Sequence, residues 1–320
     1  MSLKGSEKMK IVFMGTPDFS VPVLKQLAEV YEVVAVVTQP DRPVGRKKVL
    51  TPPPVKVAAT ELNIPVLQPE KVRVKEELEL IFEYEPDLIV TAAYGQILPK
   101  ALLDFPRLGC VNVHASLLPK YRGGAPIHQS IIDGESETGV TIMYMVEKLD
   151  AGDILTQVRV PIEEEDHVGT VHDKLSQAGA SLLMETIPQL VDGSLVAKRQ
   201  NDQEATFARN ISREMEELNW SRTGEELYNQ IRGLHPWPVA YTSFRGKPIK
   251  VWWASKVTTN KQATPGEIIE MEEDGFIVAT GNKTALKMED IQPAGKKRMT
   301  ADTFLRGTTI ELGEKLGDKE

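Results

Sequence analysis

The chain has 320 residues, of which 41% are hydrophobic and 26% are charged, a size and composition that fit two globular domains and exclude wholesale disorder. No apolar run approaches the roughly 18 residues that cross a bilayer, and the only cysteine, Cys110, excludes an internal disulfide and a multi-cysteine zinc site. The formal net charge of −8 argues against a surface that is positive throughout, and the lack of an apolar leader favours a cytoplasmic protein without a membrane partner.

Strands and helices alternate along the first part of the chain. Residues 1–8 (MSLKGSEK) are interpreted as a non-native segment ahead of a natural start at Met9. An apolar run, a glycine turn, an amphipathic helix and a β-branched run then predict a βαβ unit over residues 10–38. Further helices are predicted at 54–62, 73–84, 125–132 and about 168–190, and further strands at 87–93, 110–114 and 139–145. This alternation predicts an α/β fold, with a Rossmann-like open parallel sheet in an N-terminal domain at residues 9–192.

The pattern changes after a polar stretch at residues 193–207, which is predicted to be a linker. A helix is expected near residues 223–232. Turn signals separate short strands that are predicted at 239–245, 248–255, 265–271, 275–280 and 285–290. Five short strands with tight turns predict a small β-barrel of the oligonucleotide-binding type as a C-terminal domain, residues 208–320.

Several well-known nucleotide-binding and hydrolase motifs are absent. Gly15-Thr16-Pro17 follows the first predicted strand, but the second and third glycines of G-x-G-x-x-G are missing, which disfavours NAD. The sequence also contains no P-loop and no G-x-S-x-G elbow. His167 and His172 have no evident third ligand, so no tightly bound metal is predicted.

Asn112 and His114 carry the most informative chemical pattern. They stand two residues apart at the end of a predicted buried strand, so their side chains share one side at the carboxyl edge of the sheet. Asp150 is expected in a glycine-containing loop off a neighbouring edge. An amide donor, an imidazole and a carboxylate together suit acyl-group transfer to an amine. In isolation, the more ordinary explanations are that Asn112 caps a loop, that His114 makes a local hydrogen bond and that Asp150 is a turn residue.

The surrounding residues resemble the folate-dependent formyltransferases. The resemblance rests on NVHASLLPKYRGGAPI at 112–127 and LDAGDI at 149–154, which arrive in the family's order. These segments imply formyl transfer but leave the acceptor open. Other segments resemble the methionyl-tRNA formyltransferases: GTPDFSVPVL at 15–24, TQPDRPVGRKK at 38–48, AAYGQILPK at 92–100, HPWP at 235–238 and QPAGKKRM at 292–299. The resemblance extends from Lys10 to Arg306, and His235 departs from the asparagine that usually precedes Pro-Trp-Pro.

The resemblance implies 10-formyltetrahydrofolate as co-substrate, with tetrahydrofolate left after transfer, and the α-amine of methionine on initiator methionyl-tRNA as acceptor. It implies that Asn112 bonds the formyl oxygen, that His114 stabilises charge or handles a proton, and that Asp150 accepts the amine proton. Which of His114 and Asp150 is the working base stays open, because coupled groups titrate together. The folate site is expected at Ser116, Leu117, Leu118, Pro119, Tyr94, Gly95, Gln96 and Ile97.

A basic loop stands out on this acidic chain. Its prolines and glycine preclude a regular helix, and its cations are Arg42, Arg46, Lys47 and Lys48. Such a loop suits contact with the phosphates of RNA, although a solvated surface loop is the plain alternative. The resemblance favours tRNA contact, and we expect the enzyme to act as a monomer.

Three other functions remain as alternatives. A formyltransferase acting on a small amine, such as a nucleotide amino sugar, would keep Asn112, His114 and Asp150 but would not need the basic loop. A non-catalytic RNA-binding protein would need the loop but not the three polar residues. An NAD-dependent enzyme would need glycines that the sequence lacks.

Overall fold

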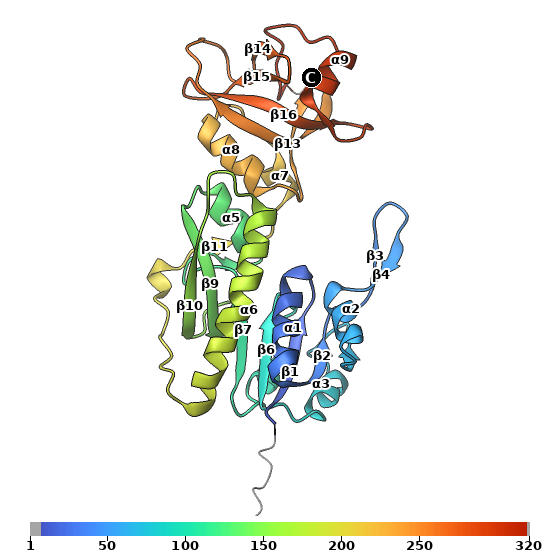
Figure 1. Ribbon diagram of the computed structural model, residues 1–320, viewed down its shortest axis with the longest axis vertical. Coiled ribbons are helices and arrows are strands. Elements are labelled where there is room, and N and C mark those ends of the chain that lie inside the picture. Colours follow the sequence, from blue (N-terminus) through green and yellow to red (C-terminus); the bar gives the residue numbers. More distant parts are fainter. Residues whose placement is uncertain (1–7, 319–320) are drawn as a thin grey trace, which may run out of the picture. The chain divides into compact units, whose positions relative to one another are not determined.

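The computed structural model describes residues 8–318 and divides them into two compact units (Figure 1). The first unit comprises residues 8–123, 138–160 and 172–207, and the second comprises residues 124–137, 161–171 and 208–318. These units differ from the predicted domains, because the predicted linker lies in the first unit and two segments of the predicted N-terminal domain lie in the second. Residues 1–7 of the predicted non-native segment lie outside the described residues.

The first unit contains a seven-stranded sheet with the order β10-β9-β7-β6-β1-β2-β5. Its strands are β1 (Lys10–Gly15), β2 (Glu32–Val37), β5 (Val66–Leu67), β6 (Leu88–Ala92), β7 (Cys110–His114), β9 (Glu137–Tyr144) and β10 (Ile154–Pro161). The accompanying helices are α1 (Val21–Val30), α2 (Pro54–Glu61), α3 (Lys75–Phe82), α4 (Lys100–Leu103) and α6 (Val168–Asp192). Because β1, β2, β5, β6 and β7 pair in parallel, the predicted α/β class is confirmed.

The sheet is not parallel throughout, because β9 pairs with β7 in the antiparallel sense. Between these strands the chain forms only one seven-residue helix, α5 (Pro126–Ile132). The sheet is therefore mixed, with an antiparallel strand beside its parallel part.

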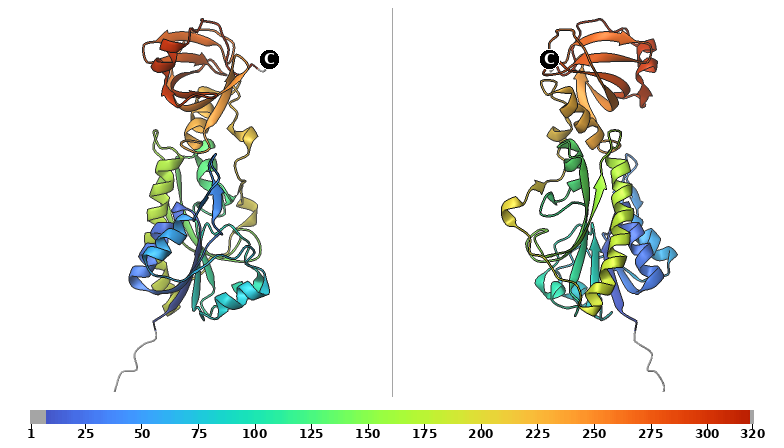
Figure 2. Two further views of the ribbon diagram at one scale, coloured as in Figure 1. Left: turned by 90° about the vertical axis from the view of Figure 1, so that its right-hand side faces the viewer. Right: turned by 60° about the vertical axis from the view of Figure 1, so that its left-hand side comes forward.

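Helices cover both faces of the sheet (Figure 2). On one face, Val12 of β1 lies in a buried cluster with Leu78 of α3 and Leu102 of α4. On the other face, α6 approaches β7 so closely that a Cβ on Gly179 would lie 2.8 Å from Val113. No helix within residues 8–318 combines the length and the apolar character that crossing a bilayer requires.

The longest element that was not predicted is strand β10, and the arm that carries the basic residues was not predicted either. β10 follows β9 next to it in the sheet, and its residues alternate between more and less buried positions, a period-two signal present in the sequence. The basic loop forms a two-stranded arm of β3 (Arg42–Val44) and β4 (Val49–Thr51), which is visible beyond α2 in Figure 1. All residues of these two strands are exposed, so no burial pattern marks them in the sequence.

The second unit contains an antiparallel sheet with the order β12-β13-β16-β15-β14, and β17 pairs with β16. Its strands are β12 (Ala240–Phe244), β13 (Lys247–Val257), β14 (Ile268–Glu272), β15 (Gly275–Ala279), β16 (Ala285–Pro293) and β17 (Met299–Thr300). Five of them match the five predicted strands. The remaining helices of this unit are α5, α7 (Arg213–Glu216), α8 (Gly224–Gly233) and α9 (Ala301–Gly307).

Residues near 316 close this sheet into a barrel. The main-chain nitrogen of Gly317 donates to the oxygen of Ser243 on β12, at 2.9 Å. The neighbouring nitrogen of Leu316 donates to Gly266, just before β14, at 2.8 Å. β12 and β14 are the two ends of the strand order, so one segment satisfies both open edges.

Cys110, the first residue of β7, is buried between the sheet and α4. Its side chain is 2% exposed, and burial raises the pKa of the thiol to about 12. The sulfur lies 3.5 Å from the main-chain oxygen of Leu102 on α4. The thiolate, which is the reactive form, is therefore scarce at any ordinary pH.

We expect Cys110 to resist iodoacetamide in the folded protein near pH 8.5, about the pKa of an unperturbed cysteine. Alkylation should become fast after denaturation at the same pH. Mass spectrometry of the labelled chain measures both rates. Equal rates in the two states would contradict the buried position of Cys110.

Candidate active site

The predicted site residues lie where parallel strands end. Thr91 of β6 pairs in register with Asn112 of β7, and Gly15 of β1 pairs with Ala92 of β6. The carboxyl ends of these three strands therefore reach one edge, where open α/β sheets bind ligands. His114 is the last residue of β7 and stands on the same side as Asn112.

The amide of Asn112 is oriented by its neighbour in the sheet. Thr91 Oγ1 donates to Asn112 Oδ1 over 2.8 Å. An amide has an acceptor end and a donor end, so this bond leaves Nδ2 as the group that faces a ligand. The pair thus provides a positioned N–H donor at the edge of the sheet.

The ring of His114 is fixed by a main-chain contact. Its Nε2 lies 3.0 Å from the main-chain oxygen of Tyr121. A carbonyl oxygen can only accept, so Nε2 carries the proton and Nδ1 presents the lone pair of the neutral ring. Nδ1 lies 3.8 Å from Oδ2 of Asp150, beyond the reach of a direct hydrogen bond. The imidazole nitrogen and the carboxylate oxygen therefore face each other across a short gap.

Asp150 lies in the loop between β9 and β10. Its side chain is 13% exposed, and its Oδ2 accepts a hydrogen bond of 2.8 Å from the main-chain nitrogen of Gly123. The backbone of Asp150 has φ of +46°, a left-handed conformation that is costly for a residue with a Cβ. The structure therefore brings Asn112, His114 and Asp150 together at one place.

The segment Ser116–Pro119 forms a buried, hydrogen-bonded loop next to these residues. Thr141 of β9 donates through Oγ1 to the oxygen of Ser116 over 2.7 Å and accepts from the nitrogen of Leu118 over 3.1 Å. Gln157 of β10 donates to Thr141 Oγ1 and to the oxygen of Leu118, both at 2.9 Å. The peptide bond before Pro119 is cis. One hydroxyl therefore organises most of this loop.

The second predicted ligand segment, residues 94–97, follows β6. Tyr94 is 4% exposed and belongs to the hydrophobic cluster of the sheet, so its ring packs in the core. The amide of Gln96 bonds the nitrogen of Val72 and the oxygen of Pro69, which ties the loop down. Ile97 exposes 80% of its surface. In this segment, the Ile97 side chain and the main chain at Gly95 remain for a ligand.

The predicted basic residues divide into two groups on the arm of β3 and β4. Arg42 forms an ion pair of 2.7 Å with Glu70. Arg46, Lys47 and Lys48 at the turn are exposed, and no ion pair is found for them within residues 8–318. Of the four predicted basic residues, the three at the turn are therefore the ones available to attract an anion.

The sequence analysis assigned no role to two further residues of this region. Arg122 is 1% exposed, and Gln200, in the predicted linker, is 7% exposed. Nε2 of Gln200 donates to the main-chain oxygens of Asp150 and Gly152, at 2.8 and 2.7 Å. These partners lie about fifty residues away along the chain, so no local motif marks Gln200.

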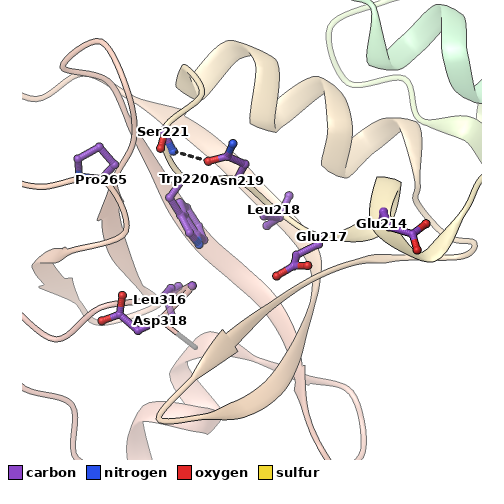
Figure 3. A pocket seen from close by; sticks show the side chains of 10 residues that line it. Glu214, Glu217, Leu218, Asn219, Trp220, Ser221, Pro265, Leu316 and Asp318 are labelled. Carbon is purple, nitrogen blue, oxygen red and sulfur yellow. Dashed lines mark hydrogen bonds between the residues drawn. The ribbon is translucent and has the colours of Figure 1, made fainter. Parts of the chain in front are cut away.

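Neither Gly15 nor the pocket of the second unit contributes a side chain to this site. A Cβ on Gly15 would lie 2.9 Å from the oxygen of Ala92, so this glycine serves close packing between strands. A pocket shown in Figure 3 lies in the second unit, and none of the predicted site residues lines it. Its lining residues are Glu214, Glu217, Leu218, Asn219, Trp220, Ser221, Pro265, Leu316, Gly317 and Asp318.

Comparison with protein families agrees with this geometry. The family described as formyl transferase matches residues 9–187, and the one described as formyl transferase, C-terminal domain, matches residues 210–309. The chain belongs to the formyl transferase family. The first match contains the strand ends, Asn112, His114 and Asp150, and the second contains the barrel strands.

Curated relatives match over nearly the whole chain. The methionyl-tRNA formyltransferase of Halalkalibacterium halodurans is 68% identical over 315 residues, 98% of this chain and 99% of that protein. The methionyl-tRNA formyltransferase of Bacillus subtilis is 63% identical over 309 residues, 96% of this chain and 98% of that protein. These identities extend across both units.

Solved structures share the fold at low identity. A sugar 3N-formyl transferase, WlaRD, has a TM-score of 0.65 at 19% identity and covers 91% of this chain and 100% of its own. An N-formyltransferase from Helicobacter canadensis, in complex with folinic acid and dTDP-3-aminofucose, has a TM-score of 0.62 at 18% identity. It covers 89% of this chain and 99% of its own. At such identities the likeness concerns the fold.

We expect Thr141→Val to lower the free energy of unfolding by about 1–3 kcal/mol, because it leaves buried main-chain groups of the loop without a partner. Thr141→Ser keeps the hydroxyl and should retain most of the stability. Denaturant unfolding of the three proteins measures the difference. If the valine variant were as stable as the serine variant, the hydroxyl would not organise the loop.

Proposed function

We propose that this formyl transferase moves the formyl group of 10-formyltetrahydrofolate to the α-amine of methionine on initiator methionyl-tRNA, for translation initiation. The observation that carries the proposal is the meeting of Asn112, His114 and Asp150 at one edge of the sheet. The relatives named methionyl-tRNA formyltransferases support the acceptor, since they match both units of the chain. An enzyme of translation initiation would act in the cytoplasm, and we propose a monomer.

The reaction needs a donor for the formyl oxygen. The amine nitrogen forms a bond to the formyl carbon, and negative charge develops on the formyl oxygen before the bond to the folate nitrogen breaks. Nδ2 of Asn112, oriented by Thr91, is placed to donate to that oxygen. A positioned donor of this kind contributes on the order of 10²–10³ in rate.

The reaction also needs a proton acceptor, because the attacking amine must lose a proton while the leaving folate nitrogen gains one. The lone pair of His114 Nδ1 and the carboxylate of Asp150 face each other across 3.8 Å. A proton taken by either atom is stabilised by the other group. We therefore assign proton transfer to the pair and not to one of its members.

The region beside the three polar residues suits a folate. A pterin is flat and rich in amide-like groups, so it can be bonded by main-chain atoms of a well-ordered loop. Ser116, Leu117, Leu118 and Pro119 form such a loop. Ile97 offers exposed apolar surface after β6, beside the open main chain at Gly95. The side chains of Tyr94 and Gln96 hold this segment in place, since Tyr94 packs in the core and Gln96 bonds the main chain of Val72.

The arm of β3 and β4 suits the tRNA acceptor. Its turn presents Arg46, Lys47 and Lys48 on a chain whose net charge is −8. Exposed cations on a projecting arm can neutralise phosphates, which supplies much of the affinity for nucleic acid. The barrel, which we propose as a second tRNA-binding part, exposes Lys247, Lys296 and Lys297.

A formyl-transfer assay with 10-formyltetrahydrofolate tests the proposal. Methionyl-tRNA, free methionine and a nucleotide amino sugar are offered in parallel. Transfer to the tRNA alone is the expected result. Transfer to the small amine alone would retain the chemistry of the site and refute the acceptor, and RNA binding without transfer would refute catalysis.

Asp150→Asn should lower kcat by at least about a hundredfold, because general base catalysis contributes roughly 10²–10⁴. The variant should fold normally, since an amide oxygen can still accept from Gly123. Asp153→Asn, on the same loop, is the matched control and should leave kcat near that of the wild type. Near-normal turnover by folded Asp150→Asn would remove Asp150 from the mechanism.

Replacing Arg46, Lys47 and Lys48 together by glutamine should weaken tRNA binding and lower the slope of log affinity against log salt by about 0.7–0.9 for each phosphate that the arm no longer neutralises. Transfer measured with saturating tRNA should change less than affinity. A variant that exchanges lysine and arginine at the three positions keeps the charge and should keep the slope. An unchanged slope in the glutamine variant would show that the arm does not contact phosphate.

A further inference from the structure

The amide of Gln200 spans the loop that carries Asp150. Its Nε2 donates to the main-chain oxygens of Asp150 and Gly152, so one side chain ties together both residues that flank Ala151. Gln200 belongs to neither strand β9 nor strand β10, and it reaches the loop from the segment after α6. The contact is buried, since Gln200 is 7% exposed.

Arg122 fixes which way that amide points. Its Nε and one terminal nitrogen donate to Gln200 Oε1, at 3.1 and 2.8 Å. A guanidinium has donors only, so the oxygen of Gln200 must face Arg122 and the nitrogen must face the loop. Hydrogen bonds from Lys148 and Arg122 hold the pKa of the Asp202 carboxyl below its ordinary value, so Asp202 supplies a negative partner for the buried guanidinium.

The loop needs such a restraint for two reasons. Asp150 has φ of +46°, a left-handed conformation that costs a residue with a Cβ more than it costs glycine. At Gly152 the chain passes so close to β9 that a Cβ would lie 1.8 Å from the oxygen of Tyr144. The Asp150 carboxylate, for its part, makes one hydrogen bond, to the nitrogen of Gly123, next to Arg122.

We propose that Gln200, oriented by Arg122, is a positioning residue that holds the Asp150 carboxylate opposite Nδ1 of His114. The expected loss of kcat rests on the proposed function. The restraint of the loop depends only on the hydrogen bonds of Gln200. Gln200 touches no reacting atom and acts through Asp150. Losing the amide lets the loop relax away from its left-handed conformation, and a displacement of about 1 Å costs on the order of 10² in rate.

The first test is a double-mutant cycle. Gln200→Met removes the amide without adding charge, and kcat with methionyl-tRNA should fall between about ten- and a hundredfold, with little change in KM. In an Asp150→Asn background the same change should have almost no further effect, because the residue it positions is already gone. Equal fold-losses in both backgrounds, or a Gln200→Met variant within twofold of wild type, would overturn the proposal.

Two further variants separate positioning from folding. Gln200→Glu keeps a partner for Arg122, so it should fold even if the methionine variant does not. It replaces the donor by an oxygen, and kcat should fall as in the methionine variant. Gln189→Met, an exposed glutamine on α6, is the matched control and should behave as wild type. A Gln200→Glu variant with wild-type kcat would contradict the role of the donor.

Hydrogen exchange gives a readout that does not depend on activity. Residues 145–153 and the nitrogen of Gly123 should exchange faster in Gln200→Glu than in wild type, while the strands of the sheet stay protected. Faster exchange together with no transfer by the wild type would refute the proposed function and leave the positioning role. Unchanged exchange would refute the positioning role even if transfer is normal.

Discussion

Parallel pairing of β1, β6 and β7 is the constraint on which the site depends. It brings the ends of β1, β6 and β7 to one edge of the sheet, where Thr91 of β6 lies beside Asn112 of β7 and His114 ends β7. β9 is antiparallel to β7 and ends beside Val111, and the loop that follows it brings Asp150 to within 3.8 Å of His114. The chemistry is therefore placed by backbone hydrogen bonding, and the side chains only complete it.

Main-chain atoms hold two of the three polar side chains of the site. The oxygen of Tyr121 sets the tautomer of His114, and the nitrogen of Gly123 holds the carboxylate of Asp150. Thr141 and Gln200 are side chains, but they too bond main-chain groups of the loops. A site built in this way is preorganised, because its donors and acceptors need little rearrangement when charge develops.

The sequence allowed most of the longer strands and helices to be predicted, because these depend on local period, and it allowed Asn112 and His114 to be paired by their spacing within one strand. Asn112 and His114 share a side for geometrical reasons that hold in any strand. No pattern in the sequence marked the antiparallel direction of β9, and the arm of β3 and β4 buries no residue that would mark it. Gln200 could not be predicted, since its role arises only when distant segments meet.

The chain passes between the two units more than once, and this affects how it can be cut. Residues 124–137 and 161–171 belong with the barrel, although both precede the last segment of the first unit. In the second unit, α5 packs against α8 so closely that a Cβ on Gly233 would lie 2.6 Å from Ile132. Hydrolysis of a single peptide bond near residue 207 would therefore not release two intact halves. A nicked molecule should stay associated on a sizing column until it is denatured.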